Sequence, residues 1–242
     1  STLVNGGNSQ QNILALDTIF TGLSSNGNLV LCNGDATAGL AIDLNLYNST
    51  YLYSWEDVSN PGVSLGSLLQ INGLSAGTYV LLAHYLTCQA SDTMVITEPE
   101  ALAISGTVVD ADCFGASTGS ITTNVSGGSM GYTYIWSGSS STANNANNLS
   151  AGNYTLTVND MYSCEYSATF AVSSPAELTV SISQSPSNGY ILQSNNANGG
   201  VSPYVHSWRE QSAPNVELGT GTIYTVSSYG NYFVRLTDAN GC

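Results

Sequence analysis

An aromatic segment that occurs three times is the feature that most constrains how this chain can fold. The copies are YLYSW at 51–55, YTYIW at 132–136 and YVHSW at 204–208, and corresponding positions recur roughly every 75 residues. Their aromatic residues stand on alternate positions, and alternate side chains of a β-strand share one face. Each copy therefore predicts a strand with an aromatic face.

Further landmarks follow each aromatic segment in a fixed order. A motif that ends in Gly-x-Tyr occurs at 74–79, 149–154 and 227–232, as LSAGTY, LSAGNY and SSYGNY. A cysteine comes next, and Pro-containing joints close the first two units, as TEPEAL and SSPAEL. Several landmarks in one order predict an array of three homologous domains. We expect repeat 1 at 13–99, repeat 2 at 100–175 and repeat 3 at 176–242, with residues 1–12 in a linker or at the end of a preceding repeat.

Each repeat has the pattern of an immunoglobulin-like sandwich. In that fold a tryptophan on strand C is buried against the opposite sheet, and a tyrosine at the start of strand F bonds back to the backbone as a tyrosine corner. The short β-branched runs between Asn-Gly and Gly-Gly turns are typical of all-β proteins. The sequence therefore predicts an all-β fold, a tandem array of three immunoglobulin-like (Greek-key) β-sandwiches. The expected core residues are Trp55, Trp136, Trp208, Tyr79, Tyr154 and Tyr232.

Charge and hydropathy exclude several classes of partner. The 242 residues include 16 acidic and only 2 basic side chains, which gives a formal charge of −14. Nucleic acids and anionic membranes are bound by clusters of Lys and Arg, so neither is expected as a partner. The chain has no apolar run of transmembrane length, so we expect no membrane insertion. A hydrophobic content of 42% is ample for a packed core.

The five cysteines fit disulfides better than metal ligands or nucleophiles. The sequence has no CxxC pair, and no base that could activate a thiol recurs from repeat to repeat. We expect the pairs Cys32–Cys88 and Cys113–Cys164, one within each of the first two repeats. A loop of that size stabilises a small domain by roughly 4 kcal/mol in the chain-entropy model. Disulfides also imply an oxidising compartment outside the cytoplasm.

Repeat 3 departs from this pattern. Ser185 stands at the position of the first cysteine, so Cys242 has no expected partner within its repeat. In repeat 2 a strand at 166–174 follows Cys164, and a similar strand is expected after Cys242. We therefore expect the sequence to be cut from a longer chain, with a strand supplied by another domain as the alternative.

The motifs of repeat 2 together resemble one known family. CFGASTGSITTNVSGGSMGYTYIWS at 113–137, LSAGNYTLTVND at 149–160 and SPAELTV at 174–180 are similar to the SprB-type repeat of giant cell-surface proteins of Bacteroidota. LTDANGC at 236–242 matches the end of the same pattern. The resemblance extends over about residues 30–242, although repeat 1 lacks the Gly-Gly before its tyrosine and repeat 3 lacks the first cysteine.

This resemblance implies type IX secretion to the cell surface and service in long filamentous adhesins. Such filaments act in gliding, attachment or contact with prey, so the expected location is extracellular, at the cell surface. The short stretches DTI at 17–19 and DTM at 92–94 also resemble the O-glycosylation signal of that phylum, which makes Thr18 and Thr93 candidate sites.

The physical features favour a structural function. Proline fixes its own φ and restricts the preceding residue, so repeats with Pro-containing joints are expected to form a semi-rigid, load-bearing stalk. The expected partners are further repeats of the same chain, other copies in a homo-oligomeric filament, and surface glycans or cells. An isolated string of domains is the alternative to lateral assembly.

Two other functions can be compared with the stalk. An array of carbohydrate-binding modules would expose Tyr or Trp rings to sugars, so it requires that the three tryptophans do not face inward. An enzyme would need facing carboxylates or a nucleophile with its base, and neither is visible, so no enzymatic activity is expected. Carboxylates at 54–59, 108–113 and 236–241 could hold Ca²⁺ between domains, but solvated turn carboxylates are the default and no cofactor is expected.

Overall fold

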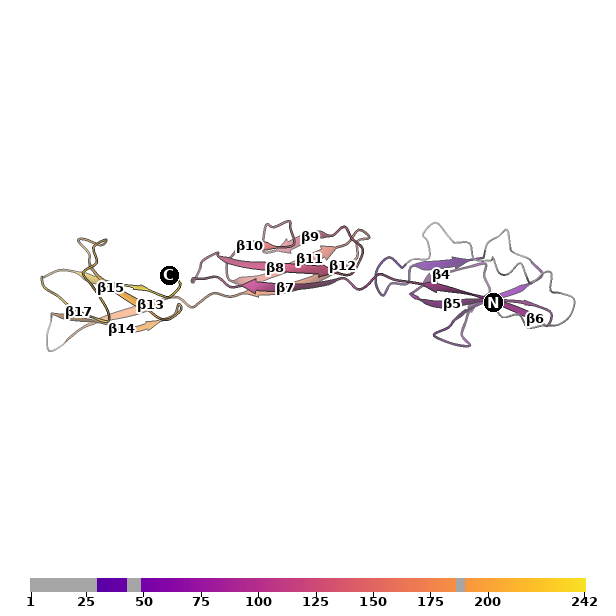
Figure 1. The fold of residues 1–242 in the computed structure, drawn as a ribbon, viewed down its shortest axis with the longest axis horizontal. Helices are drawn as coiled ribbons and strands as arrows, with labels where there is room; N and C mark the ends of the chain where they lie inside the picture. Colours follow the sequence, from indigo (N-terminus) through magenta and orange to yellow (C-terminus); the bar gives the residue numbers. More distant parts are fainter. Residues whose placement is uncertain (1–29, 43–48, 186–189) are drawn as a thin grey trace. The chain divides into compact units, whose positions relative to one another are not determined.

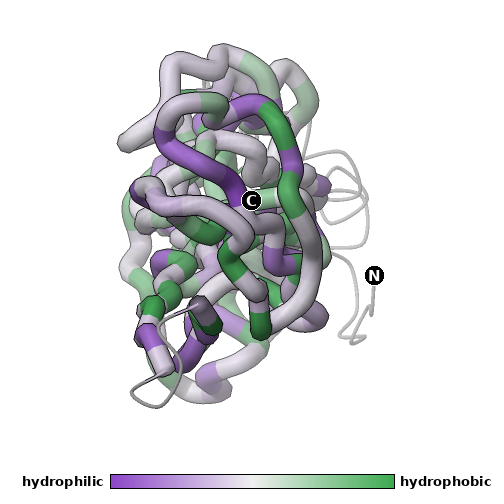
Figure 2. The backbone as a smooth tube through the Cα atoms, turned by 90° about the vertical axis from the view of Figure 1, so that its left-hand side faces the viewer, coloured by the Kyte–Doolittle hydropathy of each residue, from purple (hydrophilic) through white to green (hydrophobic). Residues whose placement is uncertain are grey.

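A computed structural model describes residues 30–42, 49–185 and 190–242 of the chain. The candidate glycosylation site Thr18 and the expected linker at 1–12 lie outside these residues. No helix in the described part is long and apolar enough to cross a membrane. Hydrophobic and hydrophilic residues are interspersed along the chain (Figure 2).

The chain divides into two compact units, and each contains part of repeat 2. One unit comprises the residues up to Ala103 together with Val125–Tyr132 and Asn159–Tyr166. The other comprises Ile104–Asn124, Thr133–Val158 and Ser167–Cys242. The boundaries of the three repeats remain a prediction from the sequence.

The strands of repeat 1 form two antiparallel sheets. One pairs β1 with β4, and the other has the order β3-β2-β5-β6. Along β5 every second residue is buried, and Tyr79, Leu81 and Ala83 pack with Trp55 in the core. The strands are β1 (Ala38–Ala41), β2 (Leu52–Asp57), β3 (Ser64–Gly66), β4 (Gln70–Leu74), β5 (Gly77–Tyr85) and β6 (Cys88–Ile96) (Figure 1).

Repeat 2 has the strand arrangement of a constant-type immunoglobulin domain without strand D. Its sheets have the orders β10-β8-β7 and β12-β11-β9, which correspond to strands E-B-A and G-F-C. Leu156 and Val158 of β11 are fully buried and face Ile121 of β8 as the inward positions of the two sheets. The strands are β7 (Ala103–Val109), β8 (Gly119–Ser126), β9 (Thr133–Ser137), β10 (Ala146–Leu149), β11 (Gly152–Asn159) and β12 (Glu165–Val172).

Repeat 3 follows the same order through strand F. Its sheets are β13-β14-β17 and β16-β15-β18. The core centres on Trp208 of β15, which is fully buried and stacks on Tyr224 with ring centroids 5.9 Å apart. The strands are β13 (Thr179–Gln184), β14 (Ile191–Asn198), β15 (Val205–Glu210), β16 (Gly219–Thr220), β17 (Ile223–Thr225) and β18 (Tyr232–Thr237).

The three repeated tryptophans are core residues. Trp55 and Trp208 are fully buried, and Trp136 is 7% exposed. Each indole N–H donates to a backbone carbonyl, at 3.0 Å to Leu68, 2.9 Å to Ala143 and 2.9 Å to Gly221. In β9 the outward residue between the aromatics, Ile135, is exposed. The tryptophan of the aromatic segment therefore recurs because each sandwich needs it in its core.

A tyrosine corner occurs in every repeat. The hydroxyls of Tyr79, Tyr154 and Tyr232 donate to the carbonyls four residues upstream, at 3.0, 2.9 and 3.0 Å. Tyr79 and Tyr154 are buried, whereas Tyr232 is only half-buried. These bonds fix the start of strand F against the chain that crosses from strand E. The predicted all-β class of tandem immunoglobulin-like sandwiches is confirmed.

We expect Tyr154→Phe to lower the free energy of unfolding by about 1 kcal/mol, because the carbonyl of Ser150 loses its donor. Tyr229→Phe serves as the matched control, since Tyr229 is fully exposed. Urea unfolding followed by tryptophan fluorescence measures both variants. Equal midpoints for the two variants would show that the corner contributes nothing.

Candidate functional site: disulfide junctions between repeats

The two disulfides join different repeats. Cys32 of repeat 1 is bonded to Cys164 of repeat 2, with Cα atoms 5.6 Å apart. Cys113 of repeat 2 is bonded to Cys242 of repeat 3, with Cα atoms 5.7 Å apart. The expected pairs Cys32–Cys88 and Cys113–Cys164 are therefore wrong. In both bonds the first cysteine of one repeat is joined to the second cysteine of the next.

The positions of the two turns explain why pairing within repeat 2 fails. Cys113 lies in the turn before β8, and Cys164 lies in the turn between β11 and β12. These A–B and F–G turns lie at opposite ends of the strands. The eight residues of β8 alone span about 26 Å. A disulfide joins Cα atoms no more than about 7 Å apart, so it cannot bridge that distance.

The F–G turn lies at the end where a repeat begins. In repeat 2 the amide of Gly128, the second residue after β8, donates to the carbonyl of Glu100 at 2.8 Å. The next amide, that of Ser129, donates to Asp160 in the F–G turn at 2.9 Å. The start of the repeat, its B–C turn and its F–G turn are thus connected by hydrogen bonds.

The A–B turn lies at the end where a repeat finishes. In repeat 2 the amide of Ser173, just after β12, donates to Asp110 Oδ1 at 2.7 Å. The amide of Ala111 donates in return to the carbonyl of Ser173 at 2.9 Å. Passage of the chain into the next repeat therefore brings the A–B turn of one repeat to the F–G turn of its successor.

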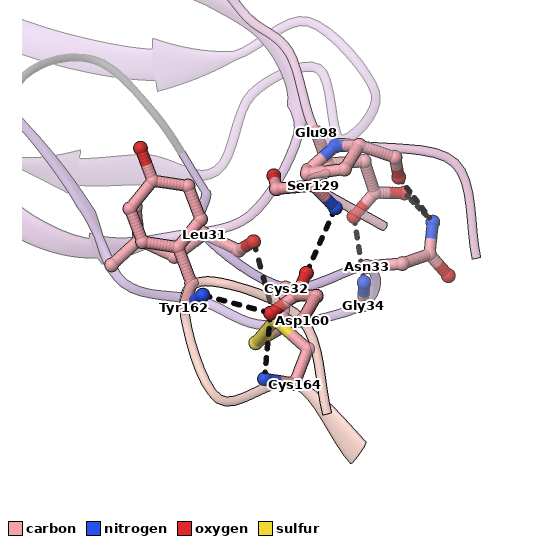
Figure 3. The surroundings of a disulfide bond; sticks show 10 residues. Leu31, Cys32, Asn33, Gly34, Glu98, Ser129, Asp160, Tyr162 and Cys164 are labelled. Carbon is pink, nitrogen blue, oxygen red and sulfur yellow. Dashed lines mark hydrogen bonds between the residues drawn. A yellow bond between two sulfur atoms is a disulfide. The ribbon is translucent and has the colours of Figure 1, made fainter. Parts of the chain in front are cut away.

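The first junction also contains a carboxylate from the Pro-containing joint. Glu98 accepts from the Gly34 amide at 2.7 Å and from Asn33 Nδ2 at 3.1 Å, and both donors follow Cys32 (Figure 3). Asn33 Nδ2 lies equally close, at 3.1 Å, to the carbonyl of Pro99. Glu98 thus ties the turn that carries Cys32 to the joint that leads into repeat 2.

An aspartate holds the turn that presents the second cysteine. Asp160 is buried, and its Oδ1 accepts from the amides of Tyr162 and Cys164, each at 2.9 Å (Figure 3). Its Oδ2 accepts from Ser129 at 2.9 Å. One carboxylate therefore fixes the backbone at the bonded cysteine and links it to the B–C turn.

The second junction repeats this arrangement. Asp238 Oδ1 accepts from the amides of Asn240 and Cys242, each at 2.9 Å, and its Oδ2 accepts from Val201 at 2.7 Å. Asn240 Nδ2 reaches the preceding repeat and donates to the carbonyl of Asp112 at 2.8 Å. The second cysteine has the same neighbour in both junctions, because its Sγ lies 3.4 Å from the carbonyl that precedes the first cysteine.

These amide contacts lower the pKa of both carboxyl groups. Partial burial raises the pKa of Asp160, but hydrogen bonds from Ser129, Cys164 and Tyr162 outweigh it and the pKa falls below the ordinary value. For Asp238 the hydrogen bond from Val201 is the largest cause, and the net pKa is again lowered. The stabilisation from each carboxylate is therefore present above the unfolded pKa of about 3.9 and is lost as the pH falls through the folded pKa.

A Gly-Gly pair makes room for the start of the repeat. Gly127 and Gly199 have φ of +74° and +78°, in the left-handed region. A Cβ at either position would collide with the backbone carbonyl of Ala101 or Glu177. The hydroxyls of Tyr132 and Tyr204 donate to the carbonyls of these glycines, at 2.6 and 2.7 Å. The first tyrosine of the aromatic segment thus holds the junction rather than the core.

Repeat 1 has a different F–G turn. Tyr85 stands where the other repeats have the aspartate, and the turn is one residue shorter. Tyr85 pairs directly with Cys88 across a two-residue hairpin, in which Leu86 has a φ of 52°. The motif Asp-x-x-x-Cys, present only in repeats 2 and 3, was the sequence signal for a junction turn.

The remaining predicted sites lie apart from the junctions. Thr93 is exposed on β6, next to Asp92, which accepts its amide at 2.8 Å. Over the described residues no cluster of three or more His, Cys, Asp or Glu side chains could hold a metal. In each of the three segments considered for Ca²⁺ one carboxylate accepts a hydrogen bond from the chain itself: Asp57 from Ser59, Asp110 from Ser173 and Asp238 from Val201.

The fold and these junctions define a class of protein, an array of immunoglobulin-like sandwiches tied to one another by disulfides. Within it, residues 105–141 match the family model of the SprB repeat, which supports the resemblance found in the sequence of repeat 2. A SprB repeat and immunoglobulin-like sandwiches are both typical of structural or adhesion proteins. Together with the disulfides they indicate an extracellular segment of that type.

Solved structures that are similar to the chain include other immunoglobulin arrays, at low sequence identity. The chain is 13% identical to Sidekick-1 immunoglobulin domains 1–5, with a TM-score of 0.33, over 80% of this chain and 46% of that one. It is 13% identical to extracellular domains 3–5 of Drosophila OTK, with a TM-score of 0.24, and the match covers 88% of this chain and 91% of that one. It is 12% identical to a Dscam structure concerned with isoform specificity, with a TM-score of 0.27, and the match covers 60% of this chain and 43% of that one. The chain thus spans less than half of the Sidekick-1 and Dscam chains, and no curated protein matches it.

The chain's two basic residues allow a direct test of the pairing. Trypsin cuts only after Arg209 and Arg235, which yields the fragments 1–209, 210–235 and 236–242. After free thiols are alkylated and the protein is digested in urea, we expect mass spectrometry to find 236–242 attached to 1–209 through Cys113–Cys242. Reduction should release it. A free, alkylated 236–242 peptide before reduction would contradict the observed pairing.

Asp238→Asn should speed reduction of Cys113–Cys242 several-fold at neutral pH, because the amide is uncharged and has only one acceptor oxygen. It can therefore keep the bonds from Asn240 and Cys242 or the bond from Val201, but not both sets, and the bonds that remain are weaker. Asp160→Asn is the matched control and should affect only Cys32–Cys164. The reduction rates of both disulfides are measured from pH 2 to 7 with a phosphine reductant and peptide mapping. Since the native carboxylate is protonated in acid, the difference from wild type should shrink as the pH falls; a difference that stays constant across this range would contradict the role given to the charge.

Proposed function

We propose that the chain is a load-bearing stalk segment of an extracellular, cell-surface filament that serves in attachment, gliding or contact with prey. The observation that carries this proposal is that both disulfides cross from one repeat to the next. The resemblance to SprB repeats supplies the cellular context, including type IX secretion.

The placement of the disulfides fits a stalk better than an isolated binding domain. Interfaces between domains of one chain are usually small and polar, so relative motion is expected unless something restrains it. A disulfide within a sandwich would stabilise that sandwich and leave the joint free. Here Cys32–Cys164 and Cys113–Cys242 restrain the two Pro-containing joints, where a filament under tension would otherwise give way first.

The carbohydrate-binding alternative loses its main support. It required exposed tryptophans, but Trp55, Trp136 and Trp208 are buried and their N–H groups are bonded to backbone carbonyls. Stacking on a sugar needs an open ring face, which these side chains do not offer. We accordingly propose a structural and not an enzymatic or sugar-binding role for the three aromatic strands.

The surface of repeat 2 supports a proposal about the partners of the stalk. Apolar side chains such as Ile135 and Tyr166 are exposed on the C-F-G sheet of repeat 2. Exposed apolar side chains favour lateral packing of copies into a filament, at a salt concentration that screens the formal charge of −14. We propose that the partners are further repeats and other copies of the chain, with cells or surface glycans bound elsewhere on the filament and with Thr93 open to glycosylation.

Cells that display this chain provide the test. We expect Cys113→Ser/Cys242→Ser cells to detach from a surface at lower shear stress than wild-type cells, because one joint loses its restraint. Antibody labelling of intact cells checks that equal amounts reach the surface. A membrane-impermeant reductant added to wild-type cells under flow should have the same effect without any folding defect. Unchanged detachment in both experiments, at equal surface display, would refute the load-bearing role.

A further inference from the structure

The loops closed by the two disulfides overlap. One loop runs from Cys32 to Cys164, and the other runs from Cys113 to Cys242. The segment 113–164 of repeat 2 lies in both. This overlap follows from the register of the bonds, since each passes from the first cysteine of one repeat to the second cysteine of the next.

We propose that the staggered disulfides give the array a second covalent path, so that a single break in the backbone between Cys32 and Cys242 leaves it covalently joined. A break at 33–112 is bridged by Cys32–Cys164, and a break at 165–241 is bridged by Cys113–Cys242. A break at 113–164 is bridged by both bonds. Repeat 2 is therefore doubly protected.

The staggered register protects the places where the backbone is most open to attack. Exposed segments are the preferred sites of proteolytic cleavage. Glu98, Glu100 and Ala101 of the first joint are exposed, as are Ser173 and Ala176 of the second. Disulfides confined to single repeats would leave both joints outside any closed loop, and one cut there would sever the chain.

The extent of this protection is set by the sequence. Ser185 stands at the first-cysteine position of repeat 3, so this repeat offers no cysteine to a successor. The protected region therefore runs from residue 33 to residue 241. The inference depends on which cysteines are bonded and not on what the filament attaches to. Its test can therefore fail while the proposed function holds, and the reverse is also true.

The test uses the full chain with a single inserted recognition sequence for a site-specific protease. One insertion lies within the exposed turn 59–63 of repeat 1, and the other lies between Ser139 and Ser140 of repeat 2. Each is made in the wild-type sequence and in two variants, Cys32→Ser/Cys164→Ser and Cys113→Ser/Cys242→Ser. The folded protein is cut, denatured without reductant and examined by non-reducing electrophoresis and mass spectrometry.

The expected pattern is specific to overlapping loops. After the cut in repeat 2, the fragments should stay joined in both double variants, because either bond alone spans that site. After the cut in repeat 1, they should separate in Cys32→Ser/Cys164→Ser and stay joined in Cys113→Ser/Cys242→Ser. Wild type should stay joined after either cut until reductant is added.

Separation of the repeat 2 fragments in either double variant would overturn the proposal, because pairing within repeats gives that result. Stepwise reduction of the cut wild-type protein provides a measurement that does not depend on folding of the variants. After the cut in repeat 2, separation should follow loss of the second disulfide; separation that follows loss of the first would equally overturn the proposal.

Discussion

The disulfide pairing between repeats is determined by two lengths, the length of a β-strand and the distance that a disulfide can bridge. The A–B and F–G turns of one sandwich lie at opposite ends of strands that span about 26 Å, whereas a disulfide needs Cα atoms within about 7 Å. Cysteines in those turns therefore cannot bond to each other. They can bond to the neighbouring repeat, because the A–B turn lies where a repeat ends and the F–G turn lies where the next one begins. The restrained joints and the overlapping loops both follow from this geometry.

A junction of this kind also needs turns that are held in place before the bond forms. Asp160 and Asp238 do this in the same way, each with two amides of its own turn and one amide of the B–C turn. The Gly-Gly pair lets the start of the repeat approach that B–C turn, which no residue with a Cβ would permit. The carboxylate, the glycines and the second cysteine therefore form one unit, and repeat 1, with Tyr85 in place of the aspartate, lacks that unit.

The parts of the fold that depend on local periodicity could be predicted from the sequence. The alternation around Trp136 reflects burial of one strand face. The Gly-x-Tyr motif that ends at Tyr154 reflects a hydrogen bond from the tyrosine to the carbonyl four residues upstream. The disulfide pairing could not be predicted from spacing, because it depends on which end of a sandwich each turn occupies. That information was present indirectly: Cys113 precedes a strand and Cys164 follows one. The role of Asp160 could not be predicted from the sequence, because aspartate is common in turns for many other reasons.

The overlap of the loops also changes how far the chain can be extended. Without disulfides, about 210 residues separate Cys32 from Cys242, which corresponds to roughly 700 Å when fully extended. With both bonds intact, the shortest covalent route passes through Cys164 and back to Cys113, over about 50 residues or roughly 170 Å. Even complete unfolding of every sandwich could not lengthen the chain between Cys32 and Cys242 beyond that limit. The load would then fall on the backbone from Cys113 to Cys164 in repeat 2. This same segment is spanned by both disulfides, so a cut within it separates the fragments only after both disulfides are lost. Strength and tolerance of damage thus have the same origin, the register of two disulfides.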